Sequence, residues 1–111
     1  MTPSKLDSPK DKILHLTVDV KTRDTEVAED GSVINAGLRP GLKLEGYEHL
    51  GTFISIVKEC ESSLGVNEQA LIELNVVCPN EYVPLFTVGG RVSLHLAQYY
   101  IADGVVCQLD F

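Results

Sequence analysis

Apolar and polar residues alternate with a period of two along several short stretches of this chain. The sequence ILHLTVDV, residues 13–20, places leucine or valine at every second position, with histidine, threonine and aspartate between them. The sequence ALIELNVVC, residues 70–78, sets alanine, isoleucine, leucine, valine and cysteine on one face, opposite glutamate and asparagine. Because successive side chains of a strand point to opposite faces, both stretches predict half-buried β-strands.

Shorter apolar runs predict further strands, separated by polar or glycine-rich connections. No segment shows a sustained helical period. Residues 23–31 and 58–69 form polar connections, and the dipeptides Gly89-Gly90 and Asp103-Gly104 are expected to break strands. Short strands with glycine-rich corners indicate an all-β antiparallel sandwich or barrel. The further strands are expected near Leu42–Glu45, Thr52–Val57, Val83–Thr87, Arg91–Ala97 and Tyr100–Leu109.

Length and composition describe one soluble globular domain. The chain has 111 residues, of which 44% are hydrophobic and 23% are charged, and this length suits a single core. Residues 1–11 are polar and without periodicity, so we expect a flexible tail there and one barrel domain over residues 12–111. No apolar run approaches the roughly 20 residues that cross a bilayer. The first residues lack a secretory signal, and we therefore expect a cytoplasmic protein without a membrane partner.

The order of these segments resembles the C-terminal β-barrel of elongation factor Tu. An acidic loop is followed by GLRPGLKLEG, a strand beginning GTF, a long strand running into CPNEYVPL, then GGRVSLHL and IADGVV. The resemblance covers about residues 12–109, and its most specific parts are Gly37, Arg39, Pro40 and the run Gly104-Val105-Val106. Leu38 stands where the family carries tyrosine. The resemblance implies a closed six-stranded antiparallel β-barrel, here as a stand-alone domain.

The glycines and proline of the segment GLRPG have a structural interpretation as a corner of such a barrel. Pro40 fixes its own φ angle, and Gly37 tolerates backbone conformations closed to other residues, so together they shape a bend at the entry to the second strand. Arg39 is expected to offer its guanidinium group to nearby carbonyls or a carboxylate. The resemblance to the elongation factor Tu barrel adds Gly104 to this set of structural residues. The alternative is that the corner is itself a binding site.

No motif in the sequence carries out chemistry, so we expect a non-enzymatic protein without a cofactor, a metal or a small-molecule substrate. A GxxxxGK[ST] phosphate loop is absent, so GTP hydrolysis is excluded. Where the family carries a glycine- and arginine-rich turn before its last strand, residues 97–100 read AQYY. These residues offer no cation to phosphate, and direct nucleic-acid binding is not expected.

Cysteines and histidines do not form a recognisable site in the sequence. Cys60, Cys78 and Cys107 lack CxxC spacing, and packing in strands is favoured over a nucleophile or metal ligand. His15 and His95 fall on the polar faces of their predicted strands, and we expect surface or rim positions for them and for His49.

The negative charge of the chain lies in its second part. The net charge is -7, yet residues 1–43 hold seven basic and seven acidic side chains. Residues 44–111 hold only Lys58 and Arg91 against nine acids. Glu26, Glu29 and Asp30 lie in one loop without the ligand spacing of a calcium site, so a solvated acidic loop is favoured. A surface of this sign repels phosphate backbones and favours basic partners.

Tyrosines stand beside carboxylates in this acidic part. Rigid tyrosine rings supply contact area and carboxylates supply electrostatic steering, a combination that suits a basic protein surface; the alternative is that these rings cap the barrel ends. We expect a protein-binding barrel, most concretely a small immunity or inhibitor protein that neutralises a basic toxin such as a nuclease. The alternative is a translation-associated module that keeps contacts with tRNA or a translation factor. The candidate partner-binding residues are Glu45, Tyr47, Glu48, Glu81, Tyr82, Tyr99, Tyr100 and Asp103.

Overall fold

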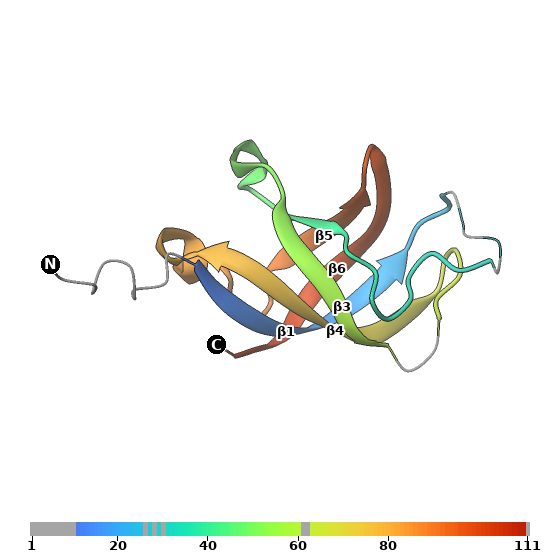
Figure 1. Cartoon of the computed structure of the whole chain (residues 1–111), viewed down its shortest axis with the longest axis horizontal. Helices are drawn as coiled ribbons and strands as arrows, with labels where there is room; N and C mark the ends of the chain where they lie inside the picture. Colours follow the sequence, from blue (N-terminus) through green and yellow to red (C-terminus); the bar gives the residue numbers. More distant parts are fainter. Residues whose placement is uncertain (1–10, 26, 28, 30, 61–62, 111) are drawn as a thin grey trace, which may run out of the picture.

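Six antiparallel strands close into a barrel in the order β1-β4-β3-β2-β5-β6 (Figure 1). The computed structural model describes residues 11–25, 27, 29, 31–60 and 63–110. The all-β class and the closed six-stranded barrel are thereby confirmed. The strands are β1 (Asp11–Thr22), β2 (Gly41–Leu44), β3 (Phe53–Cys60), β4 (Gln69–Pro79), β5 (Arg91–Leu96) and β6 (Tyr99–Asp110), with the 3-10 helices η1 (Glu48–Leu50) and η2 (Asn80–Leu85).

The strand expected at Val83–Thr87 does not form, and this prediction was wrong. Most of that stretch belongs to η2, and the backbone N–H of Phe86 donates to the Val83 carbonyl at 3.1 Å. Pro84 lies within the helix, and a proline cannot donate a ladder hydrogen bond in a sheet. Val83, Leu85 and Phe86 still pack against the core, at the end of the barrel.

Three β-bulges bend the long strands so that the sheet can close. The pairing of β3 with β4 skips Lys58, that of β6 with β5 skips Ile101, and that of β6 with β1 skips Cys107. An extra residue in one strand shifts its alternation and increases its local bend. This explains why Ile101 and Ala102, although consecutive, are both buried.

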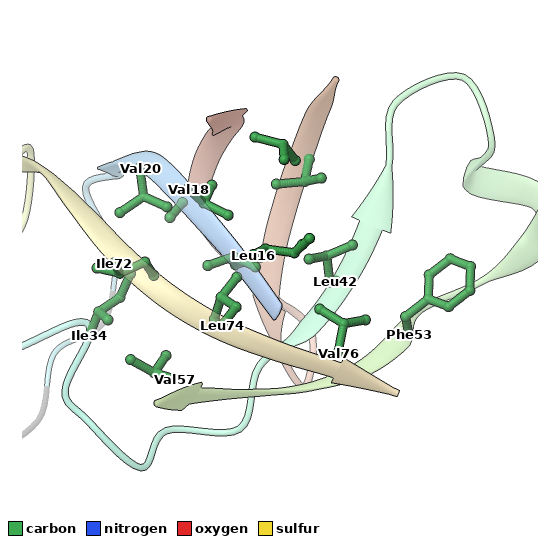
Figure 2. Close-up of a cluster of buried hydrophobic side chains, with 14 of the residues drawn as sticks. Leu16, Val18, Val20, Ile34, Leu42, Phe53, Val57, Ile72, Leu74 and Val76 are labelled. Carbon is green, nitrogen blue, oxygen red and sulfur yellow. The ribbon is translucent and has the colours of Figure 1, made fainter. Parts of the chain in front are cut away.

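The barrel interior is filled by aliphatic side chains from every strand. Figure 2 shows the inward-facing residues of β1 and β4 meeting those of β2, β3 and the connecting segment at Ile34. Cys78 is fully buried in this core, as strand packing predicts, whereas Cys107 is exposed at its bulge. β1 begins at Asp11, and residues 1–10 of the expected tail lie outside the described part. Glu26 and Asp30 of the expected acidic loop also lie outside the described residues, while Glu29 is exposed.

The segment leading from Ser32 to Pro40 closes one end of the barrel. Ile34 is fully buried and forms an isolated antiparallel bridge with Leu64. Gly37 takes a φ of 90° and donates its N–H to the Val57 carbonyl at 2.8 Å, while the Pro40 carbonyl accepts from the Ser55 hydroxyl at 2.7 Å. The bend therefore pins this segment to β3, beside the point where β2 begins.

Two members of the structural set behave differently from expectation. The Arg39 side chain is exposed and makes no hydrogen bond or ion pair with any described residue. Gly104 does not break a strand or form a corner, because β6 runs through it. A Cβ atom at Gly104 would lie 2.5 Å from Cγ1 of Val18, so glycine is needed there for space within the core.

Candidate functional site

A groove on the outer wall of the barrel gathers polar and charged side chains from four strands and from the connection after β2. Its volume is about 400 Å³. Residues of β1, β5 and β6 supply most of its lining, and Gln69 at the start of β4, Glu48 of η1 and Glu45 supply the rest. In Figure 1 the η1 turn and the β5–β6 hairpin both project from the barrel. The lining residues are Asp19, Lys21, Glu45, Glu48, Gln69, Arg91, Val92, Ser93, Tyr100, Asp103, Gly104 and Val105.

Carboxylates outnumber cations in this groove. Four acids line it, against Lys21 and Arg91. The Arg91 Nε lies 3.8 Å from Glu45 Oε2, and both side chains are largely exposed. An exposed pair of this kind contributes little stability, so the Glu45 carboxylate remains available to another cation.

Two other carboxylates of the groove, those of Asp19 and Glu48, are held by uncharged donors. The Gln69 amide donates to both Asp19 carboxylate oxygens at 3.1 and 3.2 Å. The backbone N–H of Gly46 lies 3.1 and 3.2 Å from the two Glu48 carboxylate oxygens. Hydrogen bonds to neutral donors orient a carboxylate and leave its charge in place. The groove therefore presents preoriented negative charge.

Tyr100 forms the aromatic part of the groove. Its hydroxyl donates to Oδ1 of Asp103, and the guanidinium carbon of Arg23 lies 4.0 Å from the centroid of its ring. Arg23 Nη1 also lies 3.4 Å from Asp103 Oδ2. The hydrogen bond to Asp103, followed by burial, raises the pKa of Tyr100 above its ordinary value, so the phenol is held in its neutral form. The Arg23 guanidinium therefore already occupies the position formed by the Tyr100 ring and the Asp103 carboxylate.

His95 lies on the other side of Tyr100, since β6 runs between β1 and β5. The two ring centroids are 4.8 Å apart, and the His95 Nε2 lies 2.8 Å from the Ser93 hydroxyl. Burial, together with the positive charge of Lys43, lowers the pKa of His95, which favours the neutral ring. This histidine is half-buried at the edge of the groove, whereas His15 on β1 is exposed and bonded to Asn75 at 2.7 Å.

The structure brings together half of the predicted partner-binding residues. Glu45, Glu48, Tyr100 and Asp103 line the groove. Tyr47 lies beside it in a second, smaller hollow. The remaining three lie outside both. These three are Glu81 and Tyr82 on η2, and Tyr99 at the start of β6.

Tyr82 fits the interpretation that some tyrosine rings cap the barrel ends. It is half-buried, and its ring packs edge-on against Phe53 with centroids 6.1 Å apart.

Sequence reasoning also missed contributors from the charge-balanced first part of the chain, namely Asp19, Lys21 and Arg23. The signal that could have found the first two was their outward position on the same strand as the cleanest alternation.

The second hollow adjoins the groove at Glu45 and Arg91, which line both. Its volume is about 230 Å³. Apolar and polar groups contribute nearly equally to its lining, and Tyr47, one of its apolar side chains, is 38% exposed. The lining residues are Leu44, Glu45, Tyr47, Pro84, Leu85, Thr87, Gly90, Arg91 and Val106.

Within the described part of the chain, no three histidine, cysteine, aspartate or glutamate side chains are grouped so that they could hold a metal ion. The described residues also contain no helix long and apolar enough to cross a membrane. No protein-family model and no curated protein matches this chain.

Proposed function

We propose that this barrel binds a basic protein through the groove on its outer wall. The observation that carries the proposal is the gathering of four carboxylates and the Tyr100 ring in one groove on a closed barrel. Carboxylates on a rigid frame steer cationic side chains toward the groove, and the Tyr100 ring, which Arg23 and His95 already flank, adds rigid contact area. The site needs no reacting group, and its role is recognition.

An inhibitor or immunity protein that neutralises a basic toxin, such as a nuclease, is the most concrete form of this proposal. A nuclease holds the phosphates of its substrate with a cationic surface. An acidic groove matches that surface in charge, so a barrel seated there would exclude the substrate. The net charge of -7 adds long-range attraction to the local match.

The test of the proposal compares two double charge reversals with the same change in net charge. Glu45→Lys with Glu48→Lys alters the groove. Glu59→Lys with Glu73→Lys alters an exposed pair that faces across β3 and β4, outside the groove. The partner is captured from the native host with the unaltered barrel, and its association and dissociation rates are measured at several salt concentrations.

We expect the groove reversal to slow association by about tenfold or more at low salt and to weaken its salt dependence. The control reversal should have a clearly smaller effect, because it changes net charge without touching the groove. Equal effects of the two reversals would show that only net charge matters. Unchanged rates after reversal of all four candidate acids, Glu45, Glu48, Glu81 and Asp103, would place the interface elsewhere.

A translation-associated module is the second candidate, and the exposed Arg39 side chain favours it. This guanidinium makes no contact with described residues that would occupy it, so it is available to a partner. The elongation factor Tu type of barrel, suggested by the sequence, remains part of this candidate. Filter binding with aminoacyl-tRNA discriminates the two, since salt-sensitive tRNA binding that is lost in Arg39→Gln would favour the module over the inhibitor.

A further inference from the structure

The groove and the hollow beside Tyr47 form one continuous surface. We infer that the partner presents an extended basic segment in which a lysine or arginine enters the groove and a nearby bulky apolar side chain enters the hollow. This inference rests on the proposed function and specifies the chemistry of the partner segment.

The first argument is that the groove and the hollow are continuous. Glu45 and Arg91 line both depressions, and their exposed ion pair at 3.8 Å forms the rim between them. A cationic side chain that pairs with Glu45 on the groove side therefore brings the neighbouring residues of its own segment over the hollow. An extended segment can occupy both depressions because successive side chains diverge along it.

The second argument is that the hollow includes apolar side chains on a fixed frame. Tyr47 is held in its turn by the bond from its N–H to the Leu44 carbonyl at 3.0 Å and by the bond from the Leu50 N–H to its own carbonyl at 3.0 Å. Leu85, which also lines the hollow, packs against the core. A preformed hollow with apolar side chains loses little conformational freedom on binding, which favours affinity.

The negative charge of this surface favours a basic segment of another protein over a second copy of this chain. The groove carries more carboxylates than cations, and the whole chain carries a net charge of -7. Two copies facing each other across this surface would bring like charges together, which is unfavourable. Carboxylates alone accept many cations equally, so the apolar side chain supplies both the selectivity and the longer lifetime of the complex.

The experiment uses two series of blocked synthetic peptides of equal length and charge, titrated into the isotope-labelled full chain and followed by its amide NMR shifts. Each peptide of the first series carries three arginines and one leucine, and the leucine follows the last arginine by one, two, three or four positions. In the matched series, serine replaces leucine. Tyr47→Ser removes one wall of the hollow, and Ile54→Ser removes an apolar side chain that is 69% exposed on β3, outside both depressions.

We expect one leucine spacing to bind about fivefold or more tightly than its serine match, because even part of a leucine side chain gains from leaving water. Only the leucine peptide should shift the amides of Tyr47, Leu85 and Thr87. Tyr47→Ser should abolish the leucine preference and leave the binding of the serine peptide unchanged, whereas Ile54→Ser should alter neither. Equal binding of the two series at every spacing would overturn this inference and leave the basic-partner proposal standing. Absence of binding in both series would overturn both.

Discussion

Replacing Gly104 by alanine tests whether the barrel interior is packed as tightly as its geometry indicates. Gly104 lies in the middle of β6 and faces the core, and its backbone is not in the left-handed region that favours glycine. The added methyl group would lie 2.5 Å from Val18 Cγ1, 3.2 Å from Val20 Cγ1 and 3.3 Å from Val92 Cγ2. Gly104→Ala therefore perturbs the core only through the volume of the added methyl group.

The size of the effect follows from these distances. Ordinary carbon contacts begin at about 3.5 Å, so the Val18 side chain must retreat by roughly 1 Å while two neighbouring valines also yield. Overpacking of a core typically costs 1–3 kcal/mol, and contact with three valines on two other strands places Gly104→Ala at about 3 kcal/mol. This is a large share of the roughly 5–15 kcal/mol that stabilises a domain of ordinary size.

Urea unfolding followed by circular dichroism measures the change, with Val18→Ala as the compensating variant. Val18→Ala alone should cost about 2 kcal/mol through lost burial and a cavity. In the double variant the methyl group at position 104 occupies part of that cavity, so the total should fall short of the sum by about 1 kcal/mol or more. Gly65→Ala is the control, because its Cβ would come no nearer than 3.4 Å to another atom and its φ needs no glycine. A loss under about 0.5 kcal/mol for Gly104→Ala, or strict additivity in the double variant, would refute the reasoning.

Three further outcomes are expected. Ala97 has a φ of 51° in the turn between β5 and β6, so Ala97→Gly should raise the free energy of unfolding by about 0.5 kcal/mol as strain is relieved; a clear loss in urea midpoint would contradict this. The pKa of Tyr100 is raised above 10.0 chiefly by its hydrogen bond to Asp103, so its stabilising contribution is present below pH 10 and is lost as pH rises through the folded-state pKa. Asp103→Ala should return one phenol to the ordinary range in an ultraviolet absorbance titration. Burial, and then the Asp11 carboxylate, raises the pKa of Cys78 to about 11, so an alkylating reagent at neutral pH should modify the exposed Cys107 first and Cys78 only on unfolding, as read by mass spectrometry.

Alternation in the sequence predicted the wall of the barrel because each long strand has one buried face. The faces of residues 13–20 and 70–78 could be assigned from the residues alone, and the structure places the same leucines, isoleucine and valines inward. Val83–Thr87 misled this reasoning, because a short apolar run also suits a 3-10 turn that caps a core. Pro84 argued against a strand, because proline cannot donate a ladder hydrogen bond.

The groove could be predicted only in part, since closure of the barrel decides which outward residues become neighbours. Glu45 and Asp103 were singled out by their sequence context, but nothing local indicates that Asp19 lies near them. Arg23 stacks on Tyr100 from a position 77 residues away in the chain, an encounter set by the pairing of β1 with β6. Gly104 looked like a breaker because the valines that crowd it come from other strands.

The bulges at Lys58 and Cys107 also mark two positions at which the deletion of one residue should leave the core intact. Removing a residue from a regular strand turns every later side chain to the opposite face. At a bulge the extra residue has no partner, so its loss restores an uninterrupted ladder: Val57 would be followed by Glu59 outward, and Val106 by Gln108 outward, in the existing pairing with β4 and β1. A deletion at either position changes the curvature of the wall but keeps the core residues facing inward, whereas a deletion two residues before either bulge would turn Val57 or Val106 toward solvent.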